Sequence, residues 1–346
     1  MRYIPRHVPA VHYTNYVRAL RDGDPASARH TIVALAGQGF TVDAIIRDII
    51  APAQEEIGSA WGASKITVAQ EHEATAIAED ALSALLESEG PFPPGHLGEV
   101  VLCAAEEEWH SIAARMVTVV WRHLGWQVRL LVPSLPAQDV TELIGDADIF
   151  LAGVTCAMPA NLFGAWRTIS ALRQRGCWVV VGGRGFGPDP WGERSARALG
   201  ADVYATDALS AHGTLVHLRS LGAPVRRPGL DLGERGAEAI ELTKIGPRVV
   251  ADCIDLADGL RPGLLAEDST VSQARDDLQL LYRSVVAAVL VDGSWVMEGF
   301  ASWYHDLLLS AGADPSIGDL WLDVLLRRLP ADARLARAVV EATPRS

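Results

Sequence analysis

Residues 100–116 read VVLCAAEEEWHSIAARM and combine an apolar run, a polar turn and the start of a helical pattern. The run VVLCA predicts a strand buried on both faces, as in a parallel sheet. The turn behind it carries Glu108 and His110, and the small residue Ala113 follows three positions later. Because ligands of open parallel sheets bind at the carboxyl ends of the strands, we expect the chemistry of this protein in this turn.

The alternation of apolar strand and helical pattern continues from this turn to about residue 220. Apolar strands that alternate with helices indicate a doubly wound parallel sheet of the Rossmann-like kind, which we assign to residues 97–225. A nucleotide-binding sheet is one alternative, but GGRGFG (182–187) follows a late strand, whereas the dinucleotide fingerprint follows the first. The further strands are predicted at 127–132, 148–154, 178–183 and 201–205.

Residues 11–88 have helical periodicity throughout. Asp24 is a predicted N-cap, and Thr67 with Gln70 forms a capping-box pattern at the start of another helix. Four helices joined by short turns predict a small helical bundle, which we assign to residues 1–92.

A second helical region follows the sheet. Gly- and Pro-rich stretches at 87–96 and 226–236 predict linkers on either side of the sheet domain. The pattern beyond the second linker is β-free, which predicts an all-helical domain over 236–346. Its most unusual feature is an aromatic and polar stripe, for which core packing is the plain alternative. The stripe contains Trp295, Trp303, Tyr304, His305 and Asp306.

The composition restricts the class of protein. The formal net charge is −13 and no basic run is present, so phosphate backbones would repel the chain and direct nucleic-acid binding is not expected. Four cysteines without CxxC spacing indicate buried thiols in a reducing compartment. No run of 18 apolar residues occurs, so we expect a cytoplasmic protein that does not bind membranes.

The polar turn and two later motifs resemble the signature of the cobalamin-binding domain. That signature is Asp-x-His-x-x-Gly, then Ser-x-Leu, then Gly-Gly. Glu replaces Asp, Ala replaces Gly and Thr-Cys-Ala replaces Ser-x-Leu, but each substitute keeps the chemical property that is needed. The matching residues, in order, are Glu108, His110 and Ala113, then Thr155, then Gly182 and Gly183.

The resemblance implies a base-off, histidine-on cobalamin. In that family the histidine displaces the dimethylbenzimidazole of the cofactor and becomes the lower cobalt ligand, while the nucleotide tail enters the sheet. His110 is therefore the expected metal ligand, and Glu108 is expected to hold its other ring nitrogen. Thr155 would bond the buried tail, and Ala113 would narrow its channel.

The N-terminal helices resemble those of two families from different classes. In corrinoid methyl carriers the bundle caps the cofactor, and a separate methyltransferase works on the upper cobalt face. In cobalamin photoreceptors of the CarH type, the bundle carries Trp, nine residues, then Glu-His, which cover the adenosyl group. Trp61, Glu71 and His72 reproduce this spacing and favour adenosylcobalamin. The alternative is that Trp61 packs in the core and Glu71 stabilises a helix start.

Two departures modify this resemblance. In the photoreceptor repressors a histidine directly after the Trp can capture the exposed cobalt, but Gly62 stands at that place, which leaves His72 as a substitute. The repressors also carry an N-terminal DNA-reading domain, whereas this acidic chain begins at the bundle, so we do not expect a repressor.

The C-terminal helical domain resembles the arrangement in photocobilins, which hold a bilin beside the cobalamin. The resemblance implies that the aromatic stripe binds biliverdin non-covalently, because only Cys253 lies in this domain and it sits in an apolar helix. The sequence thus predicts a cytoplasmic, self-associating light sensor that is not an enzyme. A corrinoid methyl carrier is the alternative.

Overall fold

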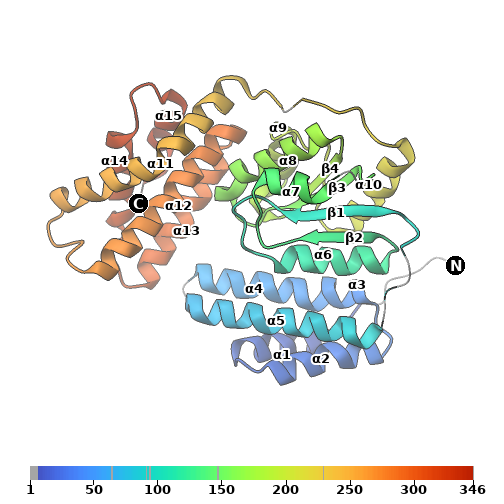
Figure 1. Cartoon of the computed structure of the whole chain (residues 1–346). Coiled ribbons are helices and arrows are strands. Elements are labelled where there is room, and N and C mark those ends of the chain that lie inside the picture. The colour runs from blue at the N-terminus through green and yellow to red at the C-terminus, as the bar shows by residue number, and fades with distance from the viewer. Residues whose placement is uncertain are drawn as a thin grey trace.

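The computed structural model describes residues 7–63, 65–90, 92, 95–145, 148–228 and 230–345. Residues 1–6 of the predicted bundle and parts of both predicted linkers lie outside this set. Figure 1 shows three parts: N-terminal helices in blue, a sheet domain in cyan to yellow-green, and C-terminal helices in orange to red. The predicted fold class is confirmed.

The N-terminal part is a helical bundle that lies against α6 (Ile112–His123) of the sheet domain (Figure 1). Asp24 accepts a hydrogen bond from the Ser27 N–H, and Thr67 and Gln70 cap each other reciprocally, so both predicted caps are confirmed. The elements are α1 (Ala10–Arg21), α2 (Pro25–Gly37), α3 (Val42–Ile45), the π-helical turn η1 (Ile46–Ile50), α4 (Ala51–Gly62) and α5 (Val68–Glu89).

The sheet has five parallel strands in the order β2-β1-β3-β4-β5. All five predicted strands form, although β5 is shorter than the predicted 201–205. The chain passes from β1 to β2 on one side and then to β3 on the other, so the carboxyl ends of β1 and β3 border the topological switch point. The strands are β1 (Glu99–Ala104), β2 (Gln127–Leu131), β3 (Leu151–Thr155), β4 (Trp178–Gly182) and β5 (Val203–Tyr204).

The two faces of the sheet belong to two different hydrophobic cores. Val100 and Leu102 pack with α6, α10 and the N-terminal bundle, whereas Val101 and Cys103 pack with α7, α8 and the C-terminal helices. This division follows from the strand period of two residues. The connections are α6 (Ile112–His123), α7 (Ala137–Ile144), the turn η2 (Pro159–Asn161), α8 (Leu162–Arg175), the turn η3 (Arg184–Phe186), α9 (Trp191–Ala198) and α10 (Ala208–Leu221).

The C-terminal part is all-helical over the residues that the structure describes, as predicted. The long helix α12, whose C-terminal end is apolar, runs through its core and also packs against the sheet domain. No helix in the described ranges is long and apolar enough to span a membrane. The elements are α11 (Gly233–Leu260), α12 (Asp268–Val291), α13 (Ser294–Ser310), α14 (Ser316–Arg328) and α15 (Arg334–Ala342).

Candidate functional site

Glu108 lies in the turn after β1 and is the buried centre of the site, with a relative exposure of 1%. One carboxylate oxygen accepts the backbone N–H groups of Ala157 at 2.7 Å and Met158 at 3.1 Å. The same oxygen accepts the Asn161 side-chain amide at 2.9 Å. These three donors follow β3, so the adjacency of β1 and β3 in the sheet brings them to Glu108. The switch point therefore contains a prearranged carboxylate.

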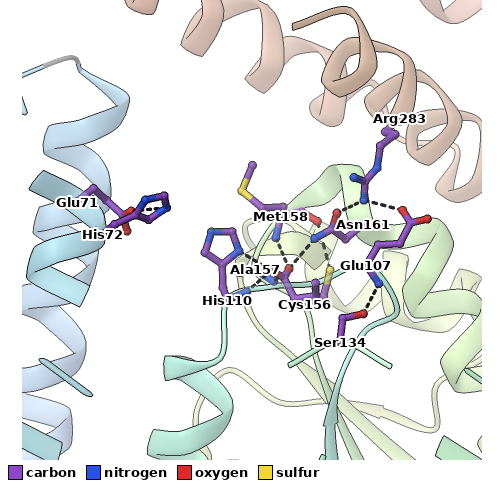
Figure 2. A network of polar contacts seen from close by, with 11 residues as sticks. Glu71, His72, Glu107, His110, Ser134, Cys156, Ala157, Met158, Asn161 and Arg283 are labelled. Carbon is purple, nitrogen blue, oxygen red and sulfur yellow. Dashed lines mark hydrogen bonds and ion pairs between the residues drawn. The ribbon is translucent and has the colours of Figure 1, made fainter. Parts of the chain in front are cut away.

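The second oxygen of Glu108 holds His110. It accepts the His110 backbone N–H at 3.0 Å and a short hydrogen bond from the imidazole Nδ1 (Figure 2). A carboxylate that only accepts fixes the proton on Nδ1, which leaves a lone pair on Nε2. The His110 side chain is 54% exposed. The predicted ligand thus presents a free ring nitrogen at the carboxyl edge of the sheet.

Glu108 and His110 shift each other's pKa in opposite directions. Burial opposes ionisation of Glu108, but hydrogen bonds and charge from His110 and the Asn161 amide outweigh it, so the pKa of Glu108 lies below its usual value. The hydrogen bond from His110 to Glu108 raises the pKa of His110, against the effect of burial, and the charge of Glu71 adds to the rise. A more basic imidazole is a stronger metal ligand.

The predicted motif residues after β3 and β4 meet at the same edge. The Thr155 hydroxyl donates to the Cys103 carbonyl at 3.5 Å, near the end of β3. Gly183 has φ +110°, and a Cβ there would lie 2.3 Å from the Cys156 carbonyl oxygen. A Cβ on Gly182 would lie 2.8 Å from the Ala205 carbonyl oxygen. Both glycines are therefore required by close packing of neighbouring strand-end loops.

Two further features border this edge. Ala113 is half-buried in the first turn of α6, next to the turn that carries His110. A groove of about 930 Å³ opens at the carboxyl ends of β4 and β5, and Gly183, Arg184 and Tyr204 contribute to its lining. The edge therefore has room for a polar ligand beside the glycine-rich turn.

The bundle places the second predicted motif opposite His110. Trp61 is the last residue but one of α4, Glu71 lies in the first turn of α5, and His72 follows it directly. Figure 2 shows Glu71 and His72 pointing from α5 toward His110. Glu71 accepts the Thr75 hydroxyl at 3.0 Å, and its other oxygen lies 3.6 Å from His72 Nε2. The His72 side chain is 74% exposed.

The single imidazole donor, His110, fits a metal whose other ligands come from a bound cofactor. Within the described ranges, no group of three or more His, Cys, Asp or Glu side chains is arranged to hold a metal ion. One imidazole oriented by a buried carboxylate suits a metal held in a macrocycle, which needs a single axial ligand from the protein. The residues present therefore fit a corrin-bound cobalt.

The predicted bilin residues all lie on α13, and the rings of Trp303 and Tyr304 are 6.1 Å apart between centroids. The buried Tyr304 hydroxyl donates to Asp277 at 2.6 Å and accepts the Trp321 indole N–H at 2.8 Å. Trp295 packs against Gly187 of the sheet domain, where a Cβ would lie 2.8 Å from the indole. Tyr304 is therefore part of the core, and Trp295 lies at the contact with the sheet domain.

The remaining stripe residues lie further along α13. Trp303 faces the bundle, with its ring centroid 5.8 Å from that of Trp61. Asp306 is exposed and His305 is half-buried. The proposed bilin contacts of the whole stripe stay a prediction.

Sequence reasoning missed two residues of the site, Asn161, which bonds Glu108, and Arg283, which bonds Asn161. It assigned Trp303 to a bilin site and did not predict its contact with Trp61. The position of Asn161, in the loop after a predicted central strand, could have indicated its role. Arg283 lies on a C-terminal helix, and no local pattern marks it.

Comparison with known families defines the class of protein. Two family models, each described as a B12 binding domain, match residues 13–86 and 98–212. The first covers the helical bundle and the second covers the sheet domain with its His110 turn. The chain is therefore a cobalamin-binding protein with a helical B12-binding domain, an α/β B12-binding domain and a C-terminal helical region.

Individual relatives are distant. The chain is 30% identical over 139 residues to the HTH-type transcriptional repressor CarH of Myxococcus xanthus, which covers 39% of this chain and 46% of that protein. It is 28% identical over 130 residues to dimethylamine corrinoid protein 3 of Methanosarcina acetivorans, covering 36% of this chain and 59% of that protein. The matched stretch thus spans about half the length of these curated relatives.

The likeness extends to a solved structure. The Methanosarcina barkeri monomethylamine corrinoid protein matches with a TM-score of 0.53 and 17% identity, covering 61% of this chain and 100% of that one. At this identity the match shows a shared fold.

Proposed function

We propose that this protein is a light sensor that binds adenosylcobalamin, with His110 as the lower cobalt ligand. Trp61, Glu71 and His72 cover the upper face. Bound adenosylcobalamin supplies a cobalt–carbon bond that light breaks. The observation that carries the proposal is the position of the Trp–Glu–His motif in the bundle, with Glu71 and His72 directed toward His110.

Contacts of Trp61 offer a route from the site to the rest of the molecule. The Trp61 ring is tilted against Trp303 of α13 at 5.8 Å. A Cβ on Gly62 would lie 3.3 Å from the Trp303 ring, so glycine permits the close approach. When space opens beneath Trp61, the ring can shift and release Trp303. Such a packing change is a two-state switch.

A corrinoid methyl carrier is the rival function, and the two Methanosarcina relatives support it. A carrier must present its upper cobalt face to a separate methyltransferase. Here Trp303 of the C-terminal region rests on Trp61, so that region would have to move aside first. This contact favours the sensor.

The bilin extension is a separate part of the proposal. Trp295 Nε1 and His305 Nδ1 are buried ring nitrogens of α13 without a hydrogen-bond partner among the described residues. Buried polar groups are usually satisfied, so these two are candidates for bonding a ligand such as biliverdin. Tyr304 already has two partners, and we assign it a supporting role beneath the ligand.

The experiment is reconstitution of the full chain with adenosylcobalamin in the dark, followed by absorption spectra before and after green light. We expect a spectral change in the light, together with altered elution in size-exclusion chromatography. An unchanged spectrum would exclude the sensor function. Transfer of the methyl group from bound methylcobalamin to an acceptor substrate, catalysed by an added corrinoid methyltransferase, would instead support the carrier. Added biliverdin should produce a red-shifted band, and its absence would exclude the bilin extension alone.

A further inference from the structure

Arg283 reaches from α12 of the C-terminal region into the turn that holds His110. Its guanidinium forms an ion pair with Glu107 at 2.8 Å and donates to the Asn161 side-chain oxygen (Figure 2). The Arg283 side chain is 31% exposed, so this contact is partly shielded from water. A residue outside both matched B12-binding domains thus bonds the neighbours of Glu108.

The Asn161 side chain has a single allowed orientation between its partners. It is 6% exposed, and it lies between a guanidinium that can only donate and an ionised carboxylate that can only accept. The amide oxygen must therefore face Arg283, while the amide nitrogen faces Glu108. Loss of Arg283 would leave that buried oxygen without its donor and would destabilise this orientation of the amide.

Glu107 is the second point at which Arg283 acts. Its φ of +69° is uncommon for a residue with a side chain, and its N–H donates to the Ser134 hydroxyl at 2.5 Å. The ion pair with Arg283 restrains this residue directly before Glu108. The guanidinium therefore restrains the turn from the side opposite His110.

We propose that Arg283 is a positioning residue for the cobalt ligand: through Asn161 and Glu107 it fixes Glu108, and Glu108 fixes the orientation and tautomer of His110. The inference rests on His110 as the lower ligand, which is part of the proposed function. It makes the C-terminal helical region a structural component of the cobalamin site. Outer partners of a metal ligand tune its basicity and orientation, so movement of α12 alters the strength of the lower ligand.

The test measures ligation directly. Full-length protein carrying 15N-labelled histidine is loaded with cob(II)alamin. In its electron paramagnetic resonance spectrum a bound histidine nitrogen splits each cobalt line into two, whereas the 14N of the cofactor's own dimethylbenzimidazole splits it into three. We expect Arg283→Gln to increase the fraction without histidine splitting and to raise the Kd for cob(II)alamin about tenfold. Arg283→Lys keeps the charge but offers a compact ammonium, so it should retain part of the histidine splitting and part of the affinity. Arg275→Gln, an exposed position on the same helix, is the matched control and should leave both unchanged.

A double-variant cycle separates positioning from domain packing. If Arg283 acts through Asn161, then Arg283→Gln and Asn161→Ser together should raise the Kd by less than the product of their single effects. Glu107→Gln removes the ion pair with Arg283 and tests that contact. It replaces Arg283→Gln in the experiment if Arg283→Gln does not fold. Unchanged splitting and Kd in folded Arg283→Gln, or in Glu107→Gln and Asn161→Ser together, would overturn the proposal.

The spectra of two variants separate the ligand role of His110 from the positioning role of Arg283. Identical spectra for the wild type and His110→Ala would reject His110 as the ligand. A changed spectrum for His110→Ala with an unchanged spectrum for Arg283→Gln would reject only the positioning role.

Discussion

The turn after β1 and the start of α5 face each other, yet they are held very differently. Glu108 is buried, and five hydrogen bonds from two segments, its own turn and the loop after β3, converge on it. Glu71 and His72 have mainly intrahelical partners, and His72 is largely exposed. The sheet side is therefore organised before a cofactor arrives, and the bundle side is free to adapt. In a sensor, the first would retain the cofactor and the second would respond.

The largest expected effect is on cofactor binding. His110→Ala should raise the Kd for adenosylcobalamin about 100-fold, the upper end of what loss of even an outer-shell partner produces. Trp61→Ala should raise it much less, because the bundle side adapts. Both are measured by spectrophotometric titration in the dark, with circular dichroism as the control for folding. Equal losses would contradict the division between a rigid and an adaptable face.

Stability without cofactor tests whether the sheet side is prearranged. Glu108→Gln places an amide where buried N–H groups need an acceptor, so the free energy of unfolding should fall by about 2 kcal/mol. Glu71→Gln on the bundle side is the matched substitution, and it should change stability by less than about 0.5 kcal/mol. Urea unfolding of cofactor-free protein measures both. A similar loss in the two variants would mean that the bundle side is equally organised.

The variant Gly62→Val tests the packing between the bundle and α13. Its added methyl groups would collide with Trp303, which should destabilise the protein by about 1 kcal/mol. Gly37→Val, also at the last residue of a helix but with no atom within 4 Å of a Cβ, is the matched control for helix propensity. The Trp303→Ala background should remove the difference between the two valine variants in thermal unfolding. Persistence of that difference would exclude the collision.

The smallest expected effect concerns Asp277 of α12, a carboxylate that bonds Tyr304 of α13. Its pKa is shifted in the opposite direction to that of Glu108. Burial raises the pKa of Asp277, although hydrogen bonds from Tyr304 and Gln273 oppose it. Its contribution to stability is full below the unfolded pKa and is lost as the pH rises through the folded pKa. The free energy of unfolding of wild type relative to Asp277→Asn should therefore fall from about pH 4 upward. A relative stability that rises with pH would show that the carboxylate is stabilised by folding.

Local patterns predicted the sheet and the His110 turn because both depend on residues close in sequence. Apolar runs mark strands, and the adjacency of β1 and β3 follows from the switch in strand order. The link from Arg283 to Asn161 spans 122 residues, and α12 carries many charged residues that look the same in sequence. Likewise, the aromatic stripe indicated a buried face, but only packing shows that Trp303 meets Trp61.

Even- and odd-numbered residues of β1 face opposite sides of the sheet, which is useful for protein engineering. Val100 and Leu102 belong to the core that includes the N-terminal bundle, and Val101 and Cys103 belong to the core that includes the C-terminal helices. The even-numbered positions of β1 can therefore be redesigned together with one core while the odd-numbered positions keep the other. A chimera that exchanges one helical domain needs redesigned packing on one face of the sheet only.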